Sequence, residues 1–195
     1  MTKRHDVRPV FLFLDIDCVI NAPGAGMVWP AAVTVSRTFE TRETPFRREH
    51  ITVTFAPVLI KALDKIRRDF AVNLVWHSTW VETPESVVKF TNMVGGLYGG
   101  DMVASPKATS TGYYPAGWKG RHIRKYLAGR GPADFIVLDD ELPKWRDTLD
   151  EFAENGNVRF LPIAPPEDWR AGTGVTPEHI AAIRAFLTAD INQQA

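Results

Sequence analysis

Two apolar runs that end abruptly in carboxylates constrain the fold of this 195-residue chain most strongly. Residues 10–15 read VFLFLD, and residues 134–139 read DFIVLD. A continuous run of β-forming residues is typical of a strand buried on both faces, and the sudden acid marks the point where such a strand reaches the edge of its sheet. We therefore expect two buried strands whose carboxyl ends carry aspartates.

Further strand and helix patterns alternate along the chain. We expect strands at residues 72–77, 102–105 and 158–163, and helices at residues 56–70, 118–127, 144–155 and 177–187. The last helix has Thr176 as its N-cap and Pro177 at its first position, which are preferred places for these residue types. Strands that alternate with helices predict an α/β fold, with a mostly parallel five-stranded sheet covered by helices on both faces.

Two segments with β-type composition, residues 33–39 and 50–55, interrupt this alternation. We predict a small β-hairpin flap at about residues 28–55, with the charged stretch of residues 40–49 at its tip. Ligands bind at the carboxyl ends of the strands in open α/β sheets, so a flap that follows the first strand is expected to lie over a ligand site. The whole chain, residues 1–195, is expected to form a single domain.

Composition excludes several classes of protein. Lys plus Arg and Asp plus Glu both number 23, so no overall charge attracts nucleic acid or an acidic membrane. Cys18 is the one cysteine, which excludes an intramolecular disulfide and a cysteine-cluster metal site and suits a reducing compartment. The apolar run of residues 10–14 is too short for a membrane span or a signal-peptide core. We expect a cytoplasmic protein without a membrane partner.

The carboxylates at the two strand ends predict a cation site. Asp15 and Asp17 lie two residues apart in an extended segment and should point to the same side. Asp139 and Asp140 follow the other acid-ended strand, and parallel strands bring their carboxyl ends to one edge. Four clustered carboxylates need a cation, and Mg²⁺ prefers such oxygen ligands. Each pair alone also fits an ordinary strand end or helix cap.

Hydroxyl groups and a lysine are expected at the same edge of the sheet. Ser78 and Thr79 directly follow the strand of residues 72–77. Lys119 lies near the start of the helix of residues 118–127, where a cation would stand beside the carboxylates. Lys107 is the alternative lysine, but it lies in a loop, and the position at a helix start favours Lys119. A kinase is disfavoured, because the chain lacks a GxxxxGK[ST] phosphate-binding loop.

Four motifs in this order carry a resemblance to a known family. They read FLFLDIDCVIN, VWHSTW, GWKGRHIRKYL and FIVLDDE, and they span roughly residues 10–141. The sequence resembles the haloacid dehalogenase (HAD) superfamily of aspartate-dependent phosphohydrolases. The tryptophan-framed WHSTW of residues 76–80 and the segment of residues 171–176 are similar to the small HAD domain associated with RNA repair proteins. The resemblance implies a Rossmann-like three-layer sandwich, with the flap in place of a large cap domain.

The resemblance also implies a role for each matching residue. Asp15 would attack phosphorus and form an aspartyl-phosphate, and Asp17 would protonate the leaving oxygen and then activate water. Ser78, preferred over Thr79 by the family's spacing, and Lys119 would bind the phosphoryl group. The implied Mg²⁺ ligands are Asp15, Asp17 through its backbone carbonyl, Asp139 and Asp140; the implied substrate contacts are Asn21, Ser78, Thr79 and Lys119.

Cys18 departs from the family pattern, because it stands where glycine is usual. A backbone conformation with positive φ would be strained at a residue with a β-carbon. Cysteine in such a place is more often a small apolar filler than a reactive thiol.

The sequence leaves the choice of substrate open between phosphorylated groups. Five aromatic residues near the expected mouth are available to stack a base or to pack the core: Trp29, Trp80, Tyr113, Tyr114 and Trp118. The loop of residues 95–117 is a candidate substrate loop. We expect a Mg²⁺-dependent phosphatase that removes a terminal phosphate from a nucleotide or a nucleic-acid end. The alternatives are a small-metabolite phosphatase, which the neutral net charge favours, and a non-catalytic HAD-fold binding domain, against which the retention of Asp15 and Asp17 argues.

Overall fold

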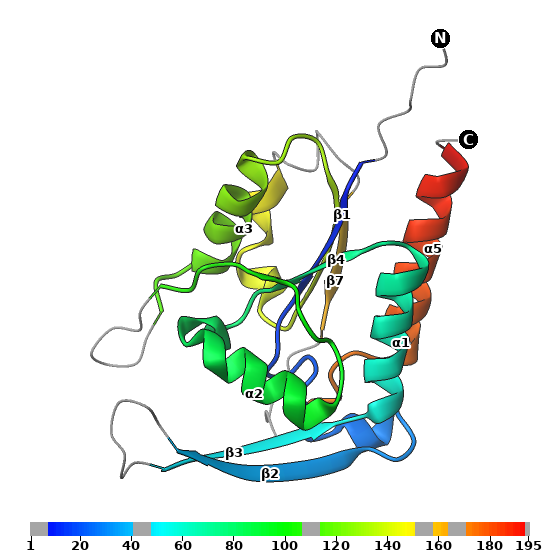
Figure 1. The fold of residues 1–195 in the computed structure, drawn as a ribbon. Helices are drawn as coiled ribbons and strands as arrows, with labels where there is room; N and C mark the ends of the chain where they lie inside the picture. The colour runs from blue at the N-terminus through cyan, green and yellow to red at the C-terminus, as the bar shows by residue number, and fades with distance from the viewer. Residues whose placement is uncertain (1–7, 41–47, 107–113, 151–157, 164–170, 194–195) are drawn as a thin grey trace.

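The computed structural model describes residues 8–40, 48–106, 114–150, 158–163 and 171–193 (Figure 1). Five parallel strands form one sheet in the order β5-β4-β1-β6-β7. They are β1 (Val10–Leu14), β4 (Asn73–Trp76), β5 (Asp101–Met102), β6 (Asp134–Asp139) and β7 (Val158–Pro162). The predicted α/β class with a parallel five-stranded sheet is confirmed. β5 is shorter than expected and begins one residue earlier.

Helices cover both faces of this sheet, because each central strand is apolar on both sides. In β1, Leu12 and Leu14 face one core, while Phe11 and Phe13 face the other. The first core is covered by α1 (Pro57–Asp69), α2 (Pro84–Val94) and α5 (Pro177–Gln193), and the second by α3 (Trp118–Ala128). Figure 1 shows α1 and α5 side by side on one face and α3 on the opposite face. Within the described part of the chain, no helix is long and apolar enough to cross a membrane.

Two helical regions differ from the expectation. α2 fills a stretch for which the pattern predicted no helix; Pro84 starts it, and Gly95 ends it in the left-handed conformation. The helix expected at residues 144–155 is, over its described part, a pair of 3-10 helices, η3 (Leu142–Lys144) and η4 (Arg146–Leu149). The Thr148 hydroxyl donates a hydrogen bond to the Trp145 carbonyl at 2.6 Å, which competes with α-helical pairing there. Residues 151–157 lie outside the described residues. α5 extends beyond the expected residue 187.

The hairpin flap is present as predicted. β2 (Val33–Glu40) and β3 (Arg48–Phe55) pair antiparallel, and hydroxyl pairs such as Ser36 with Thr52, 2.8 Å apart, join them across the outer face. The other face of β3 enters the first core through Ile51, Val53 and Phe55. Figure 1 shows the flap across the end of the molecule at which β1 ends.

β1 occupies the place in the sheet where a ligand site is expected. Its neighbours β4 and β6 lead toward opposite edges of the sheet, so the chain order reverses beside β1. In open α/β sheets the crevice at such a reversal, beyond the carboxyl ends of the strands, binds the ligand. The 3-10 helices η1 (Ala25–Met27) and η2 (Thr79–Glu82) follow β1 and β4 on this side.

Candidate active site

Strand register places three polar side chains in one row at the carboxyl edge of the sheet. Phe13 on β1 lies level with Val75 on β4 and Val137 on β6, and all three face the core under α3. Side chains two positions apart on a strand share a face. The next row on that face is therefore Asp15, His77 and Asp139, and all three are buried.

Lys119 reaches this row from the first turn of α3. Its Nζ donates a hydrogen bond to Asp139 Oδ2 at 2.6 Å and also contacts the Asp15 carboxylate. Burial alone would lower the pKa of Lys119, but the two carboxylates outweigh it and raise the pKa above its usual range. Gly120 allows α3 to pack closely against η4, since a β-carbon there would collide with the Thr148 side chain. The ammonium thus stays charged between the two carboxylates.

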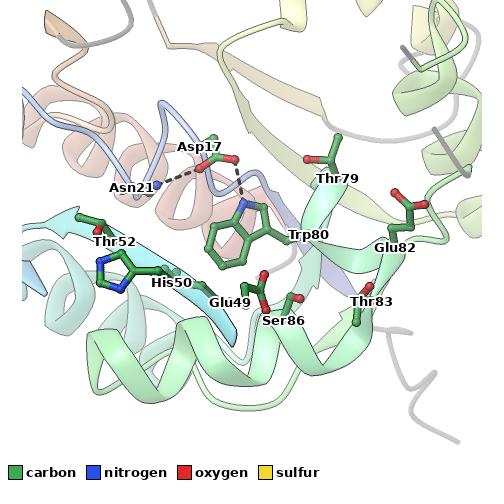
Figure 2. Close-up of a pocket in the computed structure, with 11 residues that line it drawn as sticks. Asp17, Asn21, Glu49, His50, Thr52, Thr79, Trp80, Glu82, Thr83 and Ser86 are labelled. Atoms are coloured by element: carbon green, nitrogen blue, oxygen red, sulfur yellow. Dashed lines mark hydrogen bonds between the residues drawn. The ribbon is translucent and has the colours of Figure 1, made fainter. Parts of the chain in front are cut away.

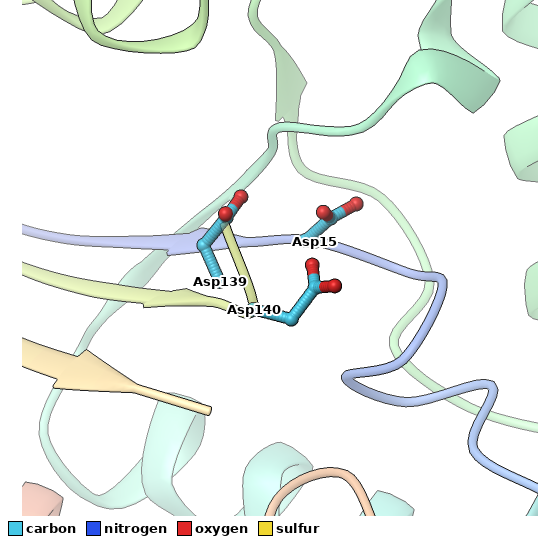
Figure 3. Close-up of side chains that lie close together, drawn as sticks. All are labelled: Asp15, Asp139 and Asp140. Carbon is cyan, nitrogen blue, oxygen red and sulfur yellow. The ribbon is translucent and has the colours of Figure 1, made fainter. Parts of the chain in front are cut away.

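Asp140 completes a cluster of three carboxylates that suits a divalent cation. One oxygen from each of Asp15, Asp139 and Asp140 lies within 4.8 Å of the others (Figure 3). Burial, and then the neighbouring Asp15 charge, raises the pKa of Asp140 to about 6, and the same two causes raise the pKa of Asp139. Three ionised carboxylates and the single ammonium of Lys119 carry a net charge of about −2, which a Mg²⁺ ion would balance.

The Asp17 side chain turns away from this cluster. β1 ends at Leu14, and the Ile16 carbonyl accepts hydrogen bonds from the amides of the next turn, so strand alternation no longer applies at Asp17. Its carboxylate instead accepts hydrogen bonds from Trp80 Nε1 at 2.7 Å and Asn21 Nδ2 at 2.9 Å (Figure 2). Desolvation raises the pKa of Asp17, and these two hydrogen bonds partly offset the rise. Of the four carboxylates expected in one cluster, Asp15, Asp139 and Asp140 lie together, and the Asp17 carboxylate lies apart from them.

A segment from the far end of the sequence supports the turn of residues 15–21, which contains both aspartates. Gly174 has a φ of +67°, and a β-carbon there would collide with the Val19 carbonyl. The Val175 amide donates to that same carbonyl at 3.0 Å. Cys18, within the turn, has a φ of +57°, as expected for a place usually held by glycine. Burial raises the pKa of the Cys18 thiol to about 11, so it is protonated at neutral pH.

The two hydroxyls that follow β4 lie in different surroundings. Ser78 is buried and is the N-cap of η2, where its Oγ accepts the Trp80 amide at 3.5 Å. Thr79 is half-buried and lines a cleft. Lys107, the alternative to Lys119, lies outside the described residues.

The cleft, of about 440 Å³, opens between the flap and the η2–α2 segment (Figure 2). It is lined by Asp17, Asn21, Glu49, His50, Ile51, Thr52, Thr79, Trp80, Glu82, Thr83 and Ser86. The α2 side is tied to β3 by an ion pair between Lys89 and Glu49, 2.8 Å long. None of the described residues of the 95–117 loop lines this cleft. It is a site of suitable size for a small organic group beside Asp17.

Of the five aromatic residues expected near the mouth, Trp80 lines the cleft. Trp29 is buried, and its Nε1 donates to the Val175 carbonyl at 2.6 Å. Trp118 is buried, with Tyr114 next to it at a ring-centroid distance of 5.8 Å. Tyr113 lies outside the described residues. Of these five residues, as far as the structure describes them, Trp80 is the one on which a base in the cleft could stack.

Sequence reasoning did not single out His77 or the contacts of Asn21. His77 Nδ1 lies 3.6 Å from Asp139 Oδ2, and burial, followed by the Lys119 charge, lowers the pKa of His77 well below its usual value. The imidazole is therefore neutral and packs against Phe13 and Trp145. The sequence does hold a signal for His77: it lies two residues after Val75, and side chains two positions apart on a strand share a face. The Asn21 carboxamide donates a hydrogen bond to Asp17 and accepts one from the Thr54 amide of β3.

Comparisons with known proteins agree with this geometry. The family model described as "HAD domain in Swiss Army Knife RNA repair proteins" matches residues 11–158. Searches of curated proteins and of solved structures found no significant match. The matched region contains β1 from its second residue onward, α3, β6 and the side chains of the carboxylate cluster. The chain therefore belongs to the HAD superfamily, in the family of HAD domains found in Swiss Army Knife RNA repair proteins.

Proposed function

We propose that the chain is a Mg²⁺-dependent phosphatase that removes a terminal phosphate from a nucleotide or a nucleic-acid end through an aspartyl-phosphate intermediate. The HAD family suggests a phosphohydrolase. The observation that carries the proposal is the contact of Lys119 with both Asp15 and Asp139 in a largely buried carboxylate cluster, while Asp17, two residues after Asp15, lines an open cleft. An ionised carboxylate held beside a buried cation is a suitable nucleophile for phosphorus.

In the first step, an Asp15 carboxylate oxygen attacks phosphorus as the bond from phosphorus to the leaving oxygen breaks. Asp17 donates its proton to that oxygen, so the product leaves as an alcohol. Lys119 offsets the negative charge on the phosphoryl oxygens. The raised pKa of Asp17 is in the direction that this role needs, because it favours the protonated form.

In the second step, Asp17, now ionised, takes a proton from a water molecule that attacks the phosphorus of the aspartyl-phosphate. The bond between phosphorus and the Asp15 oxygen breaks, which releases inorganic phosphate and restores Asp15. Asp15, Asp139 and Asp140 fit the role of ligands for Mg²⁺, and we further propose the Asp17 backbone carbonyl as a ligand. When bound, Mg²⁺ supplies positive charge that stabilises the transferring phosphoryl group.

Ser78, Thr79 and Asn21 are the remaining residues that we propose to contact the substrate. Ser78 and Thr79 stand at the carboxyl end of β4, beside the end of β1. Thr79 and Asn21 line the cleft. Trp80 offers a face on which a terminal base can stack. The family's association with RNA repair supports a nucleic-acid end as the substrate.

A small phosphorylated metabolite is the second candidate substrate. The lining residues in the described part of the chain include three carboxylates, Asp17, Glu49 and Glu82, and no lysine or arginine. A strand of nucleic acid normally requires a basic surface for its phosphates. This lining favours a substrate with a single phosphate.

The test compares wild type with Asp15→Asn in Mg²⁺-dependent hydrolysis of p-nitrophenyl phosphate, 3′- and 5′-phosphorylated oligonucleotides, mononucleotides and sugar phosphates. The matched control is Asp101→Asn, which makes the same change at an exposed aspartate on β5. We expect turnover by wild type and control and none by Asp15→Asn. Preference for oligonucleotides supports the end-processing role, and preference for sugar phosphates supports the second candidate. A folded wild type that turns over none of these substrates would instead indicate a binding domain.

A further inference from the structure

We propose that Trp80 is a positioning residue whose indole N–H holds the Asp17 carboxylate toward the leaving oxygen, so that activity depends on Trp80 most for leaving groups that need a proton. This inference rests on the proposed function, in which Asp17 is the general acid. It assigns to the second tryptophan of the WHSTW segment a role beyond stacking a base.

The geometry that points to this role is a clamp on both oxygens of one carboxylate. Trp80 Nε1 donates to Asp17 Oδ2 at 2.7 Å, and Asn21 Nδ2 donates to Asp17 Oδ1 at 2.9 Å (Figure 2). A carboxylate oxygen has more than one acceptor direction, so both oxygens remain able to exchange a proton. The clamp therefore restricts the orientation of Asp17 without blocking its chemistry.

Each donor of the clamp is itself fixed by a different part of the fold. Asn21 Oδ1 accepts the Thr54 amide of β3 at 2.9 Å, which ties this donor to the flap. The Trp80 ring meets Phe90 of α2 edge-on, with ring centroids 5.6 Å apart. Asp17 is thus held between the flap and the η2–α2 segment, which are the two walls of the cleft. A leaving group in the cleft would meet Asp17 in one orientation.

A fixed orientation matters because Asp17 lies in a turn rather than in a strand and keeps access to solvent. An unclamped carboxyl at such a position samples several rotamers, and few of them direct its proton at the leaving oxygen. The loss of orientation should slow only steps in which Asp17 transfers a proton. Departure of an alkoxide requires that proton, whereas p-nitrophenolate leaves without it.

Trp76 provides a matched control for the same chemical change. It lies four residues earlier in the same segment and meets the same Phe90 ring edge-on, with centroids 5.8 Å apart. Its Nε1 also donates a hydrogen bond, but the acceptor is the Gly99 carbonyl, 3.2 Å away. Trp76→Phe and Trp80→Phe therefore both remove an indole donor while keeping an aromatic ring, and only Trp80→Phe affects Asp17.

The experiment measures kcat/KM of wild type, Trp80→Phe and Trp76→Phe with benzyl phosphate and p-nitrophenyl phosphate. Both substrates carry one aromatic ring, so a loss of stacking affects them similarly, and kcat/KM reports the steps up to departure of the leaving group. We expect Trp80→Phe to lower kcat/KM for benzyl phosphate about tenfold or more and for p-nitrophenyl phosphate less than about threefold. Trp76→Phe should change both alike.

An equal loss on both substrates, or no loss, would overturn the positioning role while leaving the phosphatase intact. A wild type that hydrolyses neither substrate overturns the proposed function, and this inference with it. Asn21→Ala provides a second variant, because it removes the other donor. Asn21 is also a proposed substrate contact, so kcat/KM should fall on both substrates, and the loss on benzyl phosphate should be the larger. If Trp80→Phe does not fold, the result with Asn21→Ala decides.

Discussion

The two aspartates of the first motif stand two residues apart in the chain but in contrasting surroundings. Asp15 is buried against the α3 side of the sheet, beside the ammonium of Lys119. Asp17 faces the cleft and is held by the neutral donors of Trp80 and Asn21. Charge stabilisation is strongest where water is excluded, whereas proton exchange with a departing group needs an open approach. The two aspartates thus differ in that Asp15 lies in a dry region beside a buried cation, whereas Asp17 lies in an accessible cleft and is held by neutral donors.

The turn of residues 15–21 produces this difference. The Ile16 carbonyl accepts amides from Val19, Ile20 and Asn21, which rotates the chain out of the strand directly after Asp15. Loss of the buried cation should affect the site most, and changes to the turn and to the charge balance should affect it less.

Lys119→Met should have the largest effect, because it leaves Asp15 and Asp139 buried without their cation. We expect the free energy of unfolding to fall by about 3–5 kcal/mol. We expect kcat/KM to fall on the order of 10²- to 10³-fold for benzyl and p-nitrophenyl phosphate alike. Urea unfolding and steady-state kinetics measure these changes. In the matched control, Lys144→Met, the lost ion pair with Glu141 is exposed and should matter by less than about 1 kcal/mol. A loss confined to benzyl phosphate would contradict this difference between Asp15 and Asp17.

Gly174→Ala tests the support beneath the turn. The substitution puts a β-carbon at a φ of +67° against the Val19 carbonyl. We expect the free energy of unfolding to fall by about 2–3 kcal/mol, from backbone strain and overpacking together. Gly131→Ala is the control, since it has a φ of +70° and open space around the new β-carbon. Its cost should be the strain alone, about 1–2 kcal/mol. Equal losses in the two variants would show that the Val19 contact is not needed.

The charge balance of the dry region around Asp15 predicts a pH dependence of stability without added metal. The pKa of Asp140 rises from 3.8 to about 6 on folding, so between these pH values the folded state holds more protons than the unfolded state. Asp140 should therefore contribute a decrease of about 1 kcal/mol in the free energy of unfolding as pH rises from 4 to 6, once solvent screening is considered. The lowered pKa of His77 acts in the opposite direction, so the contribution of Asp140 is the difference between wild type and Asp140→Asn. Thermal or urea unfolding of both proteins at several pH values measures this difference.

As pH rises from 4 to 6, the free energy of unfolding of Asp140→Asn should increase relative to that of wild type, because the variant lacks this titrating group. Excess Mg²⁺ should make the free energy of unfolding of the wild type increase more with rising pH than it does without metal, since the ion binds the ionised carboxylates and stabilises the folded state. A slope that is the same with and without Mg²⁺ would argue against a metal site at Asp15, Asp139 and Asp140.

Cys18→Gly should have the smallest effect, and it should be stabilising. Glycine relieves the strain of a φ of +57°, although it adds backbone entropy to the unfolded chain. We expect a net gain of about 0.5–1 kcal/mol in the free energy of unfolding, with kcat unchanged. Cys18→Ala keeps the β-carbon and should bring no such gain. If both variants behave alike, the strain at residue 18 is not significant.

The sequence by itself determined the elements whose patterns are local. The acid-ended runs at residues 10–15 and 134–139, the alternation of strands with helices and the hairpin of β2 and β3 follow from side-chain type and spacing. The motifs also placed Asp15, Lys119, Asp139 and Asp140 at one edge of the sheet, because parallel strands end on the same side. The sequence pattern did not predict α2 or the 3-10 helices η3 and η4, because tertiary packing can override weak local signals.

Only the tertiary structure decided what each polar side chain of the site faces. His77 joins the row of Asp15 and Asp139 through strand register, a relation between segments about 60 residues apart. Asp17 turns from Asp15 to Trp80 because the turn is shaped by the flap and by Gly174, which lies far along the chain. The spacing of residues along one strand determines which side chains share a face. The partners of a side chain depend on contacts between distant segments, which form only when the whole chain is packed.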